Sequence, residues 1–135
     1  MSAKSSFLSE ERKSIEQSVA MVDGLLARES MSQYEVIALG TLLQNIYTGI
    51  ESIVRYRLQE QGHKIQKTEN WHKELLLKAK ENNYISEPQF KNLLELLLFR
   101  HLHVHGYGYM LDEERLRELA RPVHALCDEL LKGIE

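Results

Sequence analysis

Apolar residues recur at steps of three and four positions along five segments of the chain, a spacing typical of helices that bury one face. No segment has the strict alternation of polar and apolar residues expected of a half-buried strand. Because short polar connections separate the segments, the pattern predicts an all-α fold, a compact antiparallel helical bundle of about five helices. The predicted helices span residues 9–29, residues 32–61, residues 71–82, a fourth segment that begins at residue 86, and residues 112–134.

The apolar positions predict which side chains form the core. Gly40 and Gly49 interrupt the second helix at a cost of about 1 kcal/mol each relative to alanine, so we expect a neighbouring element to pack closely there. Pro122 is expected to kink the last helix. The predicted core residues are Ile15, Val19, Val22, Leu26, Leu39, Leu43, Ile46, Ile50, Ile53, Leu75, Leu76, Ala79, Phe90, Leu93, Leu94, Leu97, Leu98, Leu116, Leu119, Val123, Leu126, Leu130 and Ile134.

Length and composition limit the class of protein. A chain of 135 residues is long enough for one hydrophobic core and too short for two comfortable domains. We therefore expect residues 1–8 to be a flexible N-terminus and residues 9–135 to form a single domain. Cys127 is the single cysteine, which excludes an intramolecular disulfide framework and a four-cysteine zinc site.

Charge and hydropathy favour a soluble cytoplasmic protein. Apolar runs such as Leu96–Phe99 are far shorter than the roughly 20 residues that span a bilayer, so no membrane association is expected. The N-terminus has no apolar signal core. The formal net charge of −3 argues against a protein that coats nucleic acid broadly, but it leaves a local basic site open.

Such a local site lies in residues 100–109, Arg-His-Leu-His-Val-His-Gly-Tyr-Gly-Tyr, which hold one arginine, three of the six histidines and no acid. One interpretation is RNA chemistry, in which a histidine transfers protons and Arg100 binds phosphate. A second is a metal site formed by His101, His103 and His105, although no nearby carboxylate completes an obvious ligand set. The third is a polar helix end with solvated histidines. Residue chemistry alone leaves all three open.

Helix geometry restricts the first interpretation. On one unbroken helix, Arg100 and His105 would lie about 140° apart, whereas His101 and His105 would lie about 40° apart. Arg100 and His105 therefore reach one substrate only if the helix unwinds near Gly106, or if a second subunit supplies part of the site.

The motif and its setting resemble a known family. Arg100, His105 and Tyr107 form an Arg-x4-His-x-Tyr pattern at the end of an apolar helix in a small all-helical chain. This chain therefore resembles the HEPN superfamily, and within it the HepT-type ribonuclease toxins encoded beside minimal nucleotidyltransferase (MNT) antitoxins. The resemblance extends from the second helix to the fifth. Many superfamily members have asparagine directly after the arginine, where this chain has His101.

The resemblance implies a specific activity. It implies an enzyme, a metal-independent ribonuclease without cofactors, which acts as a homodimer or higher even oligomer on tRNA or mRNA. Arg100 would bind the scissile phosphate, and His105 would be the general acid or base for attack by the 2′-hydroxyl. A partner MNT nucleotidyltransferase would neutralise the toxin by transferring AMP to Tyr107, as in type VII-like toxin–antitoxin pairs.

Other residues are weaker candidates. His101 and His103 are possible auxiliary groups of the motif, and Glu51 is a candidate acid that orients a motif residue. Arg55 and Arg57 flank Tyr56 on the second helix, a basic and aromatic combination that is able to bind RNA. The alternative function is a non-catalytic helical subunit that binds substrate for a nucleotidyltransferase, which would have no need of arginine and histidine at this spacing.

Overall fold

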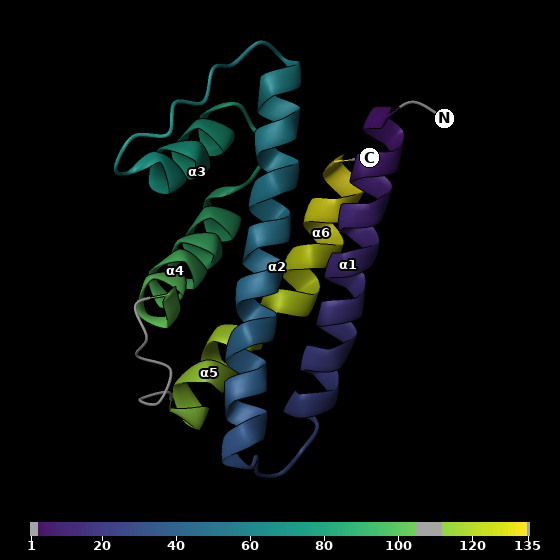
Figure 1. Ribbon diagram of the computed structural model, residues 1–135, viewed down its shortest axis with the longest axis vertical. Coiled ribbons are helices and arrows are strands. Elements are labelled where there is room, and N and C mark those ends of the chain that lie inside the picture. The colour runs from purple at the N-terminus through teal and green to yellow at the C-terminus, as the bar shows by residue number, and fades with distance from the viewer. Residues whose placement is uncertain (1–2, 105–111, 135) are drawn as a thin grey trace.

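The periodic segments form six helices in the part of the chain that the computed structural model describes, residues 3–104 and 112–134, with side chains for residues 6–100 and 112–132. The sequence predicts five helical segments, each a single helix, but the last segment forms two helices. The helices are α1 (Ala3–Leu26), α2 (Gln33–Glu60), α3 (Trp71–Glu81), α4 (Glu87–Val104), α5 (Glu113–Ala120) and α6 (Val123–Ile134) (Figure 1). The all-α prediction is confirmed.

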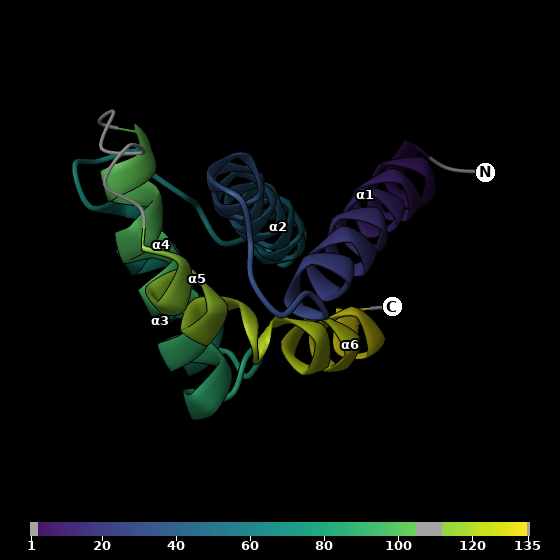
Figure 2. The same ribbon diagram turned by 90° about the horizontal axis from the view of Figure 1, so that it is seen from below.

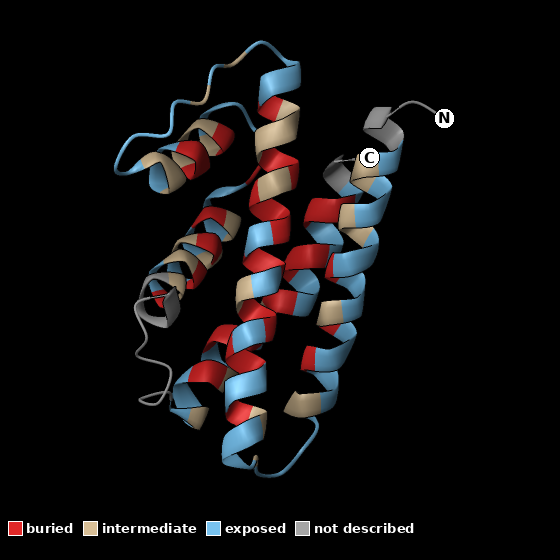
Figure 3. Cartoon of the chain, viewed as in Figure 1, coloured by how far each residue is buried: buried red, intermediate tan, exposed pale blue. Residues whose placement is uncertain are grey.

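The long helix α2 lies in the middle of the fold. Helix α1 packs on one side of it, with α6 packed against α1, and α3, α4 and α5 pack on the other side (Figures 1 and 2). Buried residues therefore follow α2 along most of its length (Figure 3). No described helix is long and apolar enough to cross a membrane.

Short polar signals set the ends of the helices around the candidate site. Ser32 and Glu35 form a reciprocal capping box at the start of α2, and Gly62, with a φ of 88°, follows its last turn. Asn83, with a φ of 64°, turns the chain after α3. Because only residues 82–86 separate α3 from α4, the two helices form an antiparallel hairpin, and the start of α3 lies toward the end of α4.

Nearly all of the predicted core residues with described side chains lie in the core or pack against it. Leu98 is the exception, because 63% of its side chain is exposed. It lies about 140° around α4 from the fully buried Leu93, whereas Leu96 and Phe99 complete the buried face. The prediction for Leu98 was wrong because four consecutive apolar residues do not reveal which of them face the core.

Two helix boundaries differ from the prediction. Helix α1 begins at Ala3 rather than Ser9, since the ring of Phe7 stacks on Tyr56 of α2 with centroids 4.9 Å apart and Leu8 packs against the core. The predicted kink at Pro122 is a complete break between α5 and α6. Proline has no N–H to continue the hydrogen-bond ladder, and its carbonyl instead accepts the first bond of α6, from the N–H of Leu126 at 3.0 Å.

Gly49 confirms the predicted close approach on α2, and its replacement should be costly. A Cβ at this position would lie 2.8 Å from Cγ1 of Ile15 on α1. We expect Gly49→Ala to lower the free energy of unfolding by about 1–2 kcal/mol, because overpacking outweighs the gain in helix propensity. Urea denaturation measures the change.

Gly24→Ala is the matched control, because nothing lies within 4 Å of a Cβ added there. This variant should be as stable as the parent protein or more stable, by up to about 1 kcal/mol. A destabilisation of equal size in both variants would contradict the proposed close contact with Ile15.

Candidate active site

Arg100 lies on the buried face of α4. It follows Leu93 by seven residues, about two turns, so both side chains point from the same face of the helix. Leu93 is fully buried, and the Arg100 side chain is half-buried with its Nε shielded from solvent. This Nε has no hydrogen-bond acceptor among the described residues. A guanidinium held in this way is suited to bind an anion, because a phosphate oxygen would satisfy the buried donor.

A buried hydrogen-bonded cluster joins α2 and α3. Glu51 is a buried acid in α2, and its Oε2 accepts hydrogen bonds from the Tyr47 hydroxyl at 2.6 Å and from Nδ1 of His72 at 2.7 Å. Burial and the negative charge of Glu51 raise the pKa of Tyr47 above its usual value, so its hydroxyl remains a proton donor. The positive charge of Arg100 acts in the opposite direction on the same pKa, which brings Arg100 within electrostatic range of this cluster.

The helical repeat explains why these groups meet. Tyr47, Glu51 and Arg55 follow one another at intervals of four residues, about 40° apart, and form one polar stripe on α2. The hairpin of α3 and α4 packs against α2, so His72 at the start of α3 and Arg100 near the end of α4 approach this stripe from two helices.

Trp71 extends the site with an aromatic surface and positive charge. The guanidinium carbon of Arg55 lies 5.8 Å from the centre of the Trp71 ring, and Nζ of Lys67 lies 5.6 Å from it. The imidazole of His72 lies against the same indole, with ring centroids 3.8 Å apart. An aromatic ring flanked by cations is able to stack on a nucleobase beside its phosphate.

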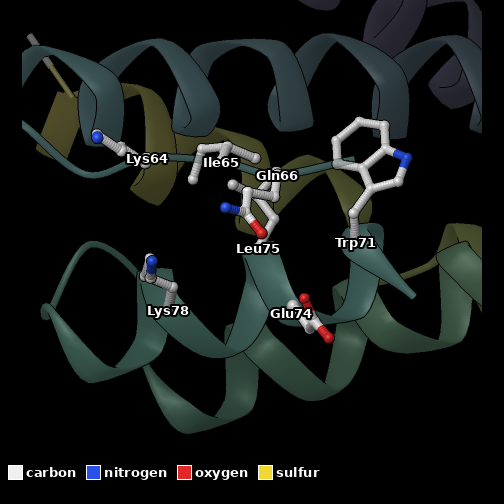
Figure 4. A pocket seen from close by; sticks show the side chains of 7 residues that line it. All are labelled: Lys64, Ile65, Gln66, Trp71, Glu74, Leu75 and Lys78. Carbon is white, nitrogen blue, oxygen red and sulfur yellow. The ribbon is translucent and has the colours of Figure 1, made fainter. Parts of the chain in front are cut away.

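A pocket of about 100 Å³ lies beside Trp71, between the connection that precedes α3 and α3 itself. Figure 4 shows Trp71 at one end of the pocket and the lysines Lys64 and Lys78 at the other. Its small volume suits part of a ligand rather than a whole nucleotide. The remaining lining residues are Ile65, Gln66, Glu74 and Leu75.

The predicted site residues have different outcomes. Glu51 lies in the hydrogen-bonded cluster, and Arg55 lies over Trp71, whose indole contacts His72 of that cluster. Arg100 lies on α4, which packs against the two helices of the cluster. Arg57 lies on another face of α2, about 160° from Arg55, and pairs with Glu60 at 3.6 Å. His101 and His103 lie in the last turns of α4, in a part whose side chains are not described, and His105 and Tyr107 lie outside the described residues.

Tyr47 and His72 were not recognised as site residues from the sequence. Tyr47 precedes Glu51 by four residues, so the spacing could have identified this pair. The partner of His72 comes from another helix, and no local pattern reveals it. Cys127 lies elsewhere, on α6, where burial raises the pKa of its thiol to about 12.

The metal interpretation gains no support from the described residues, among which no three side chains of histidine, cysteine, aspartate or glutamate form a potential metal site. His101, His103 and His105 lie outside that set, so the three-histidine alternative is untested. The Glu51 cluster satisfies its own carboxylate with two protein donors.

Comparison with known proteins gives one finding. A family profile described as "HepT-like protein" matches residues 38–135, which include most of α2, the whole of α3 to α6, and Tyr47, Glu51 and His72 of the hydrogen-bonded cluster. No curated protein and no solved structure matches the chain.

Proposed function

The chain belongs to the HepT-like protein family, and from this membership we propose that it is a ribonuclease toxin of a type VII-like toxin–antitoxin pair. The proposed reaction is metal-independent cleavage of RNA, and tRNA or mRNA in the cytoplasm is the proposed target. The observation that carries the proposal is the half-buried Arg100, whose Nε donor has no acceptor among the described residues and which lies on a helix packed against α2 and α3.

RNA supplies its own nucleophile, so this protein would need only proton transfer and charge stabilisation. Arg100 would bind the scissile phosphate and stabilise the negative charge that develops on its oxygens. His105 would accept the proton of the 2′-hydroxyl as the O2′–P bond forms. Breaking of the P–O5′ bond then leaves a 2′,3′-cyclic phosphate and a 5′-hydroxyl end. His101 and His103 are possible auxiliary groups.

RNA on either side of the cleaved bond would bind to the basic and aromatic surface around Trp71. Arg55 and Lys67 flank the indole there, and Lys64 and Lys78 border the adjacent pocket. This arrangement supports Arg55 as an RNA-binding residue, and Arg57 stays a second candidate on another face of α2. Because Arg100 and His105 would diverge on a continuous helix, we propose that a homodimer or higher even oligomer brings two motifs to one cleft.

The first test compares wild type with His105→Ala in buffer that contains EDTA, with single-stranded and structured RNA as substrates. We expect wild type to cleave RNA without added metal and His105→Ala to be slower by about 10²–10⁴-fold. Equal activity of the two proteins would contradict the role of His105. An inactive wild type that binds a nucleotidyltransferase would instead favour the non-catalytic binding subunit.

Modification of Tyr107 is a separate prediction. After co-expression with an MNT nucleotidyltransferase, intact-mass measurement should detect added AMP, and the toxin should lose RNA cleavage. A bulky anionic nucleotide next to Arg100 would occupy the position of the RNA phosphate. Tyr109→Phe serves as the control and should still be modified. An adduct that persists in Tyr107→Phe would contradict this assignment.

A further inference from the structure

His72 is held in a way that leaves one ring nitrogen available for chemistry. Its Nδ1 lies 2.7 Å from Oε2 of Glu51, and because a carboxylate only accepts hydrogen bonds, Nδ1 carries a proton. Its Nε2 makes no hydrogen bond with the described residues, and a quarter of the side chain is exposed. The indole of Trp71 restricts the ring from the side, with centroids 3.8 Å apart.

Glu51 itself is held by a second hydrogen bond. The fully buried Tyr47 donates its hydroxyl to the same Oε2, so the carboxylate has little freedom to move away from His72. A buried acid that orients a partly exposed histidine is an arrangement that enzymes use for proton transfer. Arg100, the proposed phosphate-binding group, lies on the buried face of α4, which packs against both α2 and α3.

The cleavage reaction requires a proton donor that the proposed function does not yet assign. As the O2′–P bond forms, the 2′-hydroxyl gives up one proton, and as the P–O5′ bond breaks, the leaving O5′ gains one. His105 accepts the first proton. We propose that His72, as an imidazolium with a proton on each ring nitrogen, is the general acid: it donates the proton of Nε2 to O5′ and keeps the proton of Nδ1 on the bond to Glu51, while Glu51 and Tyr47 position its ring. This inference rests on the proposed ribonuclease activity.

The chain provides a matched control histidine. His124 on α6 also bonds a carboxylate, with Nδ1 2.6 Å from Asp23, but its Nε2 lies 3.3 Å from Asp128. Both ring nitrogens of His124 therefore contact a carboxylate. The side chain is 57% exposed and lines a pocket between α1 and α6. Helix α6 lies on the other side of α2 from α4 (Figure 2).

The test uses two RNA substrates of one sequence, one with the natural bridging O5′ and one with sulfur in that position. A thiolate leaves without protonation, so the sulfur substrate needs no general acid. We expect His72→Asn, whose amide still donates to Glu51, to cleave the oxygen substrate about 100-fold more slowly than wild type in EDTA. On the sulfur substrate the loss should be less than about 5-fold.

Two further variants complete the comparison. His124→Asn should cleave both substrates at the wild-type rate, and His105→Ala should be impaired on both, because a better leaving group does not replace the base. Circular dichroism and thermal melting establish that each variant is folded.

The outcomes separate this inference from the proposed function. Wild-type cleavage together with an unimpaired His72→Asn would overturn the role of His72 and leave the ribonuclease intact. An equal loss on the oxygen and sulfur substrates would also overturn it, because that result indicates a structural role. A wild type that leaves both RNAs intact would overturn the proposed function together with this inference.

Discussion

Replacement of Arg100 by alanine is expected to slow RNA cleavage by about 10³-fold, since a single charge-stabilising donor at a phosphoryl or acyl centre contributes about that much. The fold should tolerate this change. Arg100 Nε makes no hydrogen bond with the described residues, so little native hydrogen bonding is lost there. Initial cleavage rates in EDTA, with urea denaturation of the same samples, measure the two effects separately.

Arg100→Lys is the informative companion variant. It keeps the positive charge but lacks the planar guanidinium that binds two phosphate oxygens, so we expect it to remain at least about 10-fold slower than wild type. If Arg100→Ala retains more than a tenth of the wild-type rate, Arg100 does not bind the reacting phosphate.

Replacement of Glu51 by alanine is expected to lower the free energy of unfolding by about 2–4 kcal/mol. Tyr47 is fully buried and would lose the acceptor of its hydroxyl, which costs about 1–3 kcal/mol, and the shortened side chain would leave a cavity. Urea denaturation measures this loss. The change should also slow cleavage, because His72 would lose the carboxylate that orients its ring.

A double-mutant cycle isolates the hydrogen bond. In a Tyr47→Phe background there is no hydroxyl to leave unsatisfied, so Glu51→Ala should cost about 1–2 kcal/mol less than in wild type. Glu51→Gln keeps the volume and one acceptor oxygen and should fall between wild type and Glu51→Ala. Equal costs in both backgrounds would show that the bond from Tyr47 to Glu51 contributes no stability.

The helices and their buried faces could be predicted because they depend on the spacing of apolar residues along the chain. The apolar repeat of α2 identified Leu39, Leu43 and Ile46, all fully buried. This spacing did not determine which leucine of residues 96–98 faces solvent, because a continuous run of apolar residues contains no polar position that marks the exposed face. It also did not predict the start of α1 at Ala3, which depends on the contact between Phe7 and Tyr56 of α2.

Site residues could be predicted only where neighbouring residues in the sequence identify them. Arg100 is part of a motif, and Glu51 precedes the basic and aromatic Arg55–Arg57 segment by about one turn, so both were recognised. His72 was not, because its role depends on the packing of α3 against α2, which the spacing of residues along the chain does not encode. The net charge of −3 likewise says little about a site formed by Arg100, Arg55 and Lys67.

The central claim is cleavage of RNA by its own 2′-hydroxyl at a site that contains Arg100 and His105, and analysis of the product ends tests it most directly. Purified wild type should act in EDTA and produce 2′,3′-cyclic phosphate and 5′-hydroxyl ends, and a variant with both Arg100→Ala and His105→Ala should produce neither. Intact RNA, 5′-phosphate ends, or cleavage only after a divalent metal is added would contradict the claim.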